Sequence, residues 1–413
     1  MHKARFLILG AGPAGLTMAQ MLRDRGETSV IVLEASDKVG GKCLSSPIGD
    51  HIVEFGTCYA IWSHKYILKK MKALGIRRSY LKAQRIDNRE LMDYIRDGSG
   101  PGFIPQVLKY LRLRGRLLKR LGKGDVTVNA ELARPTRDWL ADHNLGKIEN
   151  MMHRVVTSIG YGYLDRLPLI HAFRWVDFDM MLTGLLKFTV MPDGGWQNFW
   201  ERFSDPLDVQ LNANVTQVQR HAAGVSVTTE NGDEFEAETL INTIPMADFC
   251  ALTEATDDEK YVARSVDWAG YTTTLISVDT WPHDAPVNSW SDTCASDAND
   301  GKLLFYRYEC PEEGGRQLFT VGQSSAAYSP SELIELVEFD SVQRGAVKPR
   351  VVQQVIWQYM PTYAAEPIRD GLLQTMASMQ GAQRTFHTGA TFSHEAVATI
   401  STFNEGLLAK VMS

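Results

Sequence analysis

Near the start of the chain, residues 6–9 form a short apolar run that passes directly into glycines. Apolar residues then recur at helical spacing over 16–22, and a second apolar run at 30–33 closes the segment. A buried strand, a glycine turn, a helix and a further strand within about thirty residues make the βαβ unit of a parallel sheet. The opening pattern therefore predicts an α/β fold.

The rest of the chain changes period several times. Residues 76–190 show mainly helical spacing, and residues 207–244 alternate with a period of two, interrupted by glycine turns. The alternation predicts a β-meander that returns to the parallel sheet at 240–244. Strands rich in aromatic residues follow over 260–365, and a last strand, turn and helix begin at 384–389.

These patterns predict a discontinuous organisation. We expect a Rossmann-like domain assembled from residues 1–75, 192–245 and 372–413. A helical inserted region over 76–191 and a mixed-sheet substrate domain over 246–371 complete the expected fold. The chain has 413 residues, 44% of them apolar, which suffices for more than one packed unit at ~150 residues per domain.

Charge and composition exclude several classes of function. A net charge of -6 gives no overall field that attracts nucleic acid, so we expect no nucleic-acid partner. The five cysteines contain no Cys-x-x-Cys pair and the ten histidines no metal-spaced cluster, which predicts neither a disulfide framework nor a metal site. No apolar stretch approaches the ~18 residues of a membrane-spanning helix. A reducing cytoplasm is the expected compartment.

A glycine motif lies between the first strand and the first helix. Gly10 makes the tight turn, Gly12 lets a pyrophosphate approach the backbone, and Gly15 lets the helix pack closely on the strand. Pro13 and Ala14 begin the helix, whose N-terminal amides can bind phosphate. A G-x-G-x-x-G in this context predicts a dinucleotide-binding site.

Glu34 follows the second strand, about 20 residues beyond the motif, where an acidic side chain accepts hydrogen bonds from a ribose diol. The identity of the dinucleotide is open up to this point. The chain then continues through Ala35 to Gly40, Gly41 and Lys42. This segment resembles the flavin-dependent amine oxidase and carotenoid desaturase superfamily, whose members pass from the acid into a Gly-Gly-Arg segment at the flavin.

The resemblance implies FAD as the cofactor, bound also through Ala35, Gly40, Gly41 and Lys42. Lys42 replaces the usual arginine, and an ammonium group does not copy the fork of a guanidinium. The likeness continues at residues 191–195, which enter a helix. A second G-x-G-x-x-G is absent from the sequence, so we expect no NADPH-binding domain.

Two single positions extend the same resemblance. Val215 matches the family position whose backbone holds the adenine, and Gly389 precedes the helix that covers the flavin. Ala390 departs from the family, many of whose members have glutamate there.

Several further segments resemble more closely the bacterial polyunsaturated fatty acid double-bond isomerases, which share the superfamily fold. They are residues 40–43, 158–165, 173–178, 357–361 and 379–381. This resemblance implies that N5 of FAD removes a hydride from the carbon between two double bonds and returns it at another carbon. No catalytic acid or base of the protein is then expected. The alternative is an oxidase or desaturase of an amine or lipid that passes electrons to oxygen or a quinone.

Arg85, Trp357 and Tyr359 are the candidate substrate-binding residues. The isomerase resemblance implies that a basic residue at Arg85 holds the substrate carboxylate, which suits the planar fork of arginine. A surface arginine is the equal alternative at this position. We expect Trp357 and Tyr359 to wall an apolar tunnel beside the flavin, whereas in an amine oxidase two facing rings would surround an amine. Ordinary core packing is the alternative for each ring.

Residues 108–123 are basic and rich in leucine, and Gly115 is expected to interrupt them. One interpretation is peripheral contact with an anionic membrane that holds a lipid-like substrate. The other is a solvated helix whose leucines pack inward. No pattern in the chain specifies an oligomeric state.

Overall fold

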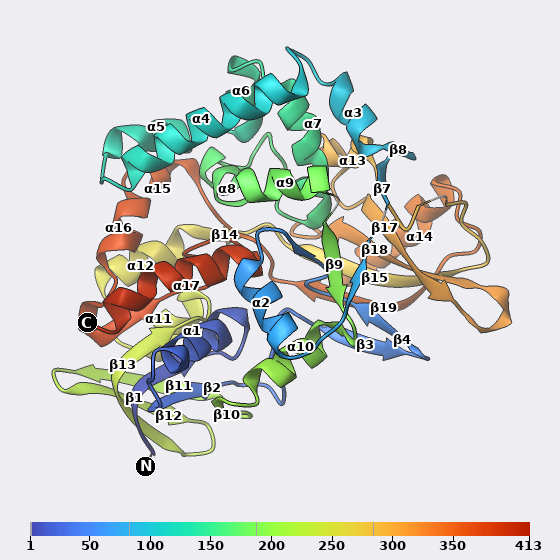
Figure 1. The fold of residues 1–413 in the computed structure, drawn as a ribbon. Helices are drawn as coiled ribbons and strands as arrows, with labels where there is room; N and C mark the ends of the chain where they lie inside the picture. Colours follow the sequence, from blue (N-terminus) through green and yellow to red (C-terminus); the bar gives the residue numbers. More distant parts are fainter. Residues whose placement is uncertain (1, 82, 187, 284) are drawn as a thin grey trace.

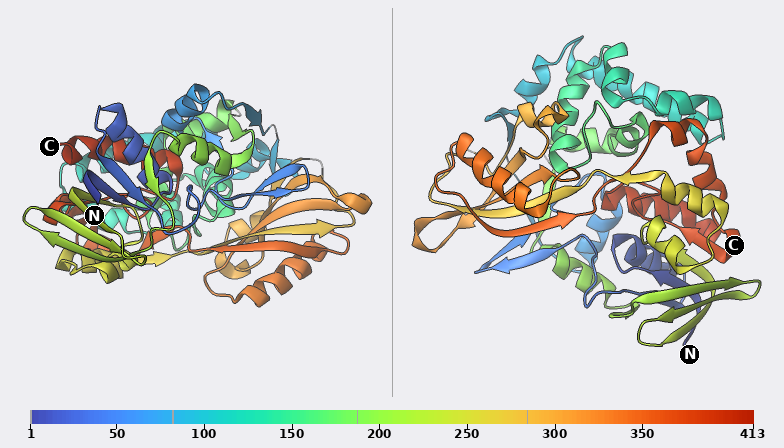
Figure 2. Two further views of the ribbon diagram at one scale, coloured as in Figure 1. Left: turned by 90° about the horizontal axis from the view of Figure 1, so that it is seen from below. Right: turned by 180° about the vertical axis from the view of Figure 1, so that it is seen from behind.

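The computed structural model describes residues 2–81, 83–186, 188–283 and 285–413. Two large sheets lie at opposite ends of the molecule, as the view from below in Figure 2 shows, and a group of helices lies across the top in Figure 1. The architecture is a mixed α/β fold, which confirms the fold class expected from the sequence.

The first sheet is built around β1 (His2–Leu9). This strand pairs in parallel with β2 (Val30–Leu33) on one side and with β13 (Glu234–Asn242) on the other. Residues 6–9 are buried because helices and loops cover both faces, which explains the continuous apolar run. The sheet also contains β10 (Asp208–Gln210), β11 (Val215–His221), β12 (Gly224–Thr229) and β21 (Thr385–His387).

Helices from both ends of the chain cover this sheet together. Helix α1 (Pro13–Asp24) connects β1 to β2 and packs against α17 (Val397–Val411). The Asn404 side-chain amide of α17 donates to the carbonyl of Ala14 at 2.9 Å and to the Thr17 hydroxyl at 2.8 Å. The last helix therefore helps to hold the first one in place.

The second sheet forms the opposite end of the molecule. Its strand order is β19 (Arg350–Trp357), β15 (Tyr271–Val278), β18 (Gln317–Ser324), β17 (Leu303–Pro311), β16 (Val287–Ser289), β7 (Gln84–Ile86) and β8 (Arg89–Glu90). Every residue of β15 is buried, because strands flank it and α14 (Pro330–Gln343) and neighbouring segments cover the sheet.

The helical region lies between residues 91 and 186. Its α-helices are α3 (Leu91–Asp97), α4 (Phe103–Leu121), α5 (Asn129–Leu132), α6 (Thr136–Asp142), α7 (Gly146–Val155), α8 (Leu169–Trp175) and α9 (Phe178–Leu186). The expectation of helix from residue 76 onward is wrong at its start. The strands β6 (Arg78–Tyr80), β7 and β8 precede the first helix of this region instead, and β7 pairs with β16 and β6 with β9 (Thr189–Pro192).

Helix α4 contains the basic, leucine-rich segment. The helix continues through Gly115, so the interruption expected there is wrong: buried Tyr110 and Leu117 anchor the helix on either side of the glycine. Leu108 is exposed. Membrane contact through residues 108–123 stays a prediction, and no helix in the described part of the chain is long and apolar enough to cross a bilayer.

The chain also contains shorter elements outside the two large sheets and the helical region. They are β3 (Ser45–Ile48), β4 (His51–Glu54), β5 (Ala60–Ile61), α2 (Lys65–Ala73), α10 (Gly195–Ser204), α11 (Met246–Leu252), α12 (Asp257–Arg264), β14 (Val266–Trp268), α13 (Ser291–Cys294), β20 (Pro361–Tyr363), α15 (Ala365–Arg369) and α16 (Leu372–Ser378).

Candidate functional site

A cavity of about 240 Å³ lies at the carboxyl ends of the parallel strands of the first sheet. The register brings these ends together, because Leu9 is opposite both Leu33 and Asn242, and Asn242 is opposite His387. The segments that leave the four strands therefore meet at one edge, where α/β sheets bind their ligands. The lining includes Gly10, Gly12, Pro13, Ala14, Glu34, Gly41, Lys42, Thr243, Thr388 and Gly389.

The glycines leave one wall of this cavity free of side chains. Helix α1 begins after Gly12 with Pro13 in its first turn, and no side chain caps its N-terminal amides. Gly41 approaches Gly12 so closely that a Cβ on Gly41 would lie 3.1 Å from the Cα of Gly12. A bare helix N-terminus facing a cavity suits a phosphate group, so this wall fits a dinucleotide.

Backbone amides hold the carboxylate of Glu34 at the cavity. The amide of Ala11 donates to Oε2 at 2.8 Å, and the amide and hydroxyl of Ser36 donate to Oε1 at 3.0 and 2.8 Å. Each carboxylate oxygen can accept further hydrogen bonds, so the side chain is oriented and still able to bind a diol.

Some of the expected cofactor residues do not line this cavity. They are Gly15, Ala35, Gly40 and Val215. A Cβ on Gly15 would lie 1.9 Å from the carbonyl oxygen of Gly10, so this glycine shapes the turn. The amide of Gly40 donates to the carbonyl of Ala11 at 2.9 Å and thereby holds the loop near the motif.

Lys42 reaches a partner that the sequence analysis missed. Its ammonium lies 3.0 Å from Oε1 of Glu395, and it lies over the rings of Trp268 and Tyr359, 4.8 and 5.5 Å from their centroids. The other oxygen of Glu395 accepts a hydrogen bond from the amide of Met360 at 2.9 Å. Glu395 lies in a loop before α17, and no motif around it marked it as a site residue.

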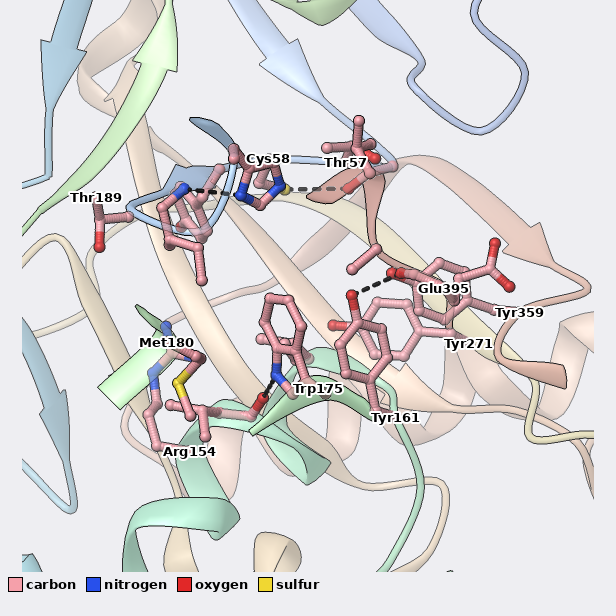
Figure 3. Close-up of a pocket in the computed structure, with 18 of the residues that line it drawn as sticks. Thr57, Cys58, Arg154, Tyr161, Trp175, Met180, Thr189, Tyr271, Tyr359 and Glu395 are labelled. Carbon is pink, nitrogen blue, oxygen red and sulfur yellow. Dashed lines mark hydrogen bonds between the residues drawn. The ribbon is translucent and has the colours of Figure 1, made fainter. Parts of the chain in front are cut away.

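A second cavity, of about 170 Å³, adjoins the first. Both cavities are lined by Thr57, Tyr359, Glu395 and Val397, which therefore form their common wall. The second lining also includes residues of β5, β7, α7, α8, α9, β9, β15, β17 and β19 and of the segment after β4, as Figure 3 shows in part.

Aromatic rings dominate the side of the second cavity nearest the common wall. Tyr161 stacks on Tyr359 at 5.8 Å between ring centroids, and Tyr271 lies 5.5 Å from Tyr359. Trp357 lines the same cavity and donates from its indole nitrogen to the carbonyl of Phe55 at 2.7 Å, which fixes its ring. Burial raises the pKa of Tyr271 and of Tyr359 well above the ordinary value for tyrosine, so both hydroxyls stay protonated.

The structure does not bring Arg85 into this cavity. Its guanidinium donates to the carbonyl of Asn88 at 3.1 Å and lies 3.7 Å from the carboxylate of Glu90, within the β7–β8 hairpin. Gln84, the preceding residue, lines the cavity instead. Side chains alternate between the two faces of a strand, so neighbours in β7 point in opposite directions.

Arg154 of α7 does line the cavity, and the sequence analysis missed it. It is 5% exposed, and its Nη1 lies 3.4 Å from the Ser158 hydroxyl. Burial lowers the pKa of its guanidinium. The available signal was a charged residue among Met151, Met152 and Val155 on a helix that packs into the core.

The chain matches known proteins both by a family model and by sequence identity. The family model of flavin containing amine oxidoreductases matches residues 13–341. The putative flavin-containing monoamine oxidase AofH of Mycobacterium tuberculosis is 30% identical over 269 residues, which cover 60% of this chain and 58% of that protein. Polyamine oxidase 3 of Oryza sativa subsp. japonica is 23% identical over 282 residues, which cover 65% of this chain and 56% of that protein. The chain thus spans less than two thirds of the length of these relatives.

Two solved structures share the fold over almost the whole chain. A CLA-producing fatty acid isomerase from P. acnes superposes with a TM-score of 0.85 at 22% identity, covering 99% of both chains. Wild-type putrescine oxidase bound to putrescine superposes with a TM-score of 0.72 at 15% identity, again covering 99% of both chains. At these identities the likeness is one of fold.

Proposed function

Because the chain belongs to the flavin-containing amine oxidoreductase family, we propose that it uses FAD to move a double bond in a polyunsaturated fatty acid or similar lipid. Family membership makes the protein a flavoenzyme with FAD as its cofactor. The isomerisation and the lipid substrate are the parts that we propose.

The observation that carries the proposal is the second cavity, which is walled by aromatic rings and adjoins the dinucleotide cavity through four shared residues. Such a cavity would accept a hydrocarbon chain and hold part of it against the common wall. The high structural similarity to a fatty acid isomerase over 99% of both chains supports the same interpretation.

The residues of the first cavity fit FAD. Glu34 is placed to accept hydrogen bonds from the ribose, and the free amides at the start of α1 are placed to bind the pyrophosphate. Gly12 and Gly41 keep the approach open. When bound, the flavin supplies a group that can accept a hydride and give it back.

The residues of the second cavity would position the lipid and keep water out. Tyr161 and Tyr359, whose rings stack on one another, bring π-systems to the second cavity, and a π-system close to an allylic carbon would stabilise positive charge that develops there. Burial keeps the hydroxyls of Tyr271 and Tyr359 protonated, so neither one is a base at neutral pH. A reaction in which the hydride taken from the substrate is returned to the substrate needs no such base.

Oxidation of an amine is the second candidate. The aromatic lining formed by Tyr161, Tyr271 and Tyr359 would also attract an ammonium group, and the chain is 30% identical to a putative monoamine oxidase over part of its length. The buried cation of Arg154 in the same cavity opposes an amine by charge repulsion.

Anaerobic incubation of the FAD-loaded protein with linoleic acid tests the proposal. We expect conjugated-diene absorbance to grow without added electron acceptor and without hydrogen peroxide in aerobic controls. Peroxide formed in proportion to an oxidised amine or lipid, with no conjugated product, would establish the oxidase instead.

A further inference from the structure

Arg154 differs from the other deeply buried arginines in having no carboxylate partner. Arg220 forms a bidentate ion pair with Glu259, at 2.5 and 2.9 Å, and Arg307 pairs with Glu309 at 2.6 Å. In the described part of the chain, no ion pair involves Arg154, and its Nε has no hydrogen-bond partner. Its long contact with the Ser158 hydroxyl is the hydrogen bond that the side chain makes.

The groups around Arg154 do not supply the missing negative charge. The titratable groups whose ionised forms would act on the Arg154 guanidinium are Tyr59, Cys294, Tyr271 and Cys58. Burial raises the pKa of each of them, to about 12 for Cys294, so all four are neutral at pH 7. A guanidinium does not deprotonate in proteins, so the cavity contains an uncompensated positive charge.

A buried charge without a partner is costly, and the cost falls when an anion with matching acceptors binds beside it. Tyr59 adds a second donor to the same cavity, because its hydroxyl is buried without a partner among the described residues. A guanidinium and a hydroxyl together suit a carboxylate, which accepts several hydrogen bonds at once.

The position of Arg154 also gives the ligand a direction. Figure 3 shows Arg154 on the side of the second cavity away from Glu395 and Tyr359. These two residues belong to the common wall with the dinucleotide cavity. Trp175 and Tyr271 line the space between these two ends. A ligand held by its head at Arg154 would therefore extend an apolar chain toward the flavin.

We propose that Arg154 binds the carboxylate of the substrate inside the cavity, and that it is the residue that selects a long-chain acid over an ester or an amine. The proposal rests on the proposed function for the kind of chain that is bound. It assigns carboxylate recognition to α7. The sequence analysis had assigned it to Arg85 of the β7–β8 hairpin, which lies near Glu90.

Equilibrium binding to the FAD-loaded protein without turnover tests this inference. Stearic acid, its methyl ester and stearylamine would be titrated while the flavin absorbance is followed, since a saturated chain has no double bond to move. We expect the acid to bind on the order of a hundredfold more tightly than the ester, and the amine to bind more weakly still. Equal affinities for acid and ester in the wild-type protein would overturn the proposal without any variant.

Two variants and a matched control locate the effect. Arg154→Met should remove the preference for the acid and leave binding of the ester unchanged. Arg154→Lys should keep part of the preference for the acid. Arg85→Met is the control and should keep the wild-type ratio. A folded, FAD-loaded Arg154→Met protein with the wild-type ratio, or loss of the ratio in Arg85→Met, would show that Arg154 does not bind the carboxylate.

The outcomes separate this inference from the proposed function. Selective binding of stearic acid that depends on Arg154, without conjugated diene from linoleic acid, would leave the inference standing and refute the isomerase. Isomerisation of acid and ester at equal rates and affinities would support the isomerase and refute the role of Arg154.

Discussion

Lys42 and Glu395 form a 3.0 Å ion pair at the wall between the two cavities. The two residues come from opposite ends of the chain, and the carboxylate is more deeply buried than the ammonium, with 10% and 33% of the side chains exposed. The pair therefore places a compensated charge where the cofactor and the substrate would meet.

Replacement of Lys42 by methionine tests the importance of this pair for the cofactor. The variant leaves the Glu395 carboxylate uncompensated beside a cavity that has to accept an anionic dinucleotide. We expect FAD to bind about tenfold more weakly, which corresponds to ~1.4 kcal/mol. Quenching of flavin fluorescence measures the affinity, and Lys42→Arg, which retains the charge, should stay close to wild type. Unchanged affinity in Lys42→Met would limit Lys42 to a structural role.

Gly12 and Gly15 should respond in opposite ways to substitution. Gly12 has extended backbone angles, and a Cβ there would lie 3.8 Å from the Cα of Gly41, which is an ordinary contact. Gly12→Val should therefore fold and yet be colourless, because its methyl groups occupy the space left for the pyrophosphate. Gly15→Ala should instead destabilise the fold by about 1–3 kcal/mol or more through overpacking against Gly10. Flavin absorbance and urea denaturation distinguish the two, and a folded yellow Gly12→Val protein would mean that the fingerprint is wrongly placed.

The fate of a deuterium label distinguishes isomerisation from oxidation. Linoleic acid deuterated at the methylene between its double bonds should give a conjugated product that keeps the label at a new carbon. The expected retention follows from the return of the same hydride to the substrate, and the hydroxyls of Tyr271 and Tyr359, which burial keeps protonated, do not act as bases. Mass spectrometry of the product reads out the position. Loss of the label, or consumption of one oxygen per turnover, would favour the oxidase.

The buried pair of Arg220 and Glu259 predicts a pH dependence of stability. Burial raises the pKa of Glu259, but hydrogen bonds from His387 and Arg220 outweigh that effect and lower it from 4.5 to about 2. Because the folded pKa lies below the unfolded value, the stabilisation is complete above about pH 4.5 and is lost as the pH falls toward 2.

Glu259→Gln measures that contribution. We expect the variant to lose about 3–5 kcal/mol at pH 7, because Arg220 is left buried without its partner. Urea denaturation at several pH values should show the difference from wild type shrinking between pH 4.5 and 2. A difference that does not change with pH would mean that the charge of Glu259 contributes nothing.

The residues that sequence analysis places well are those whose geometry is local. The glycine turn and Glu34 lie within one βαβ unit, where the order of strand, turn and helix determines where each side chain points. The family resemblance, not the local geometry, implies that Lys42 lies at the cofactor, and Lys42 lines the same cavity. Its partner Glu395 belongs to a distant loop, and no local pattern marks a contact between two such segments.

The choice between Arg85 and Arg154 shows the limit of pattern analysis in the substrate region. In strand β7 a shift of one residue exchanges the two faces, so Gln84 rather than Arg85 lines the cavity. Arg154 lies in α7, which the sequence predicts only as part of a mainly helical region, and the neighbouring Met151 and Met152 give this helix an apolar face. Only the tertiary packing shows that part of this face borders an open space.

The hydrogen bonds from Asn404 to helix α1 couple the dinucleotide cavity to a segment that is distant in sequence. Strand β21 pairs with β13 in the first sheet, and Val397 of α17 lines the cavity that Gly10 and Gly12 also line. The binding surface is therefore complete only when α17 has packed against α1. A ligand that binds this completed surface and not the unfolded chain stabilises the packing that creates it, so FAD would raise the stability of the whole fold.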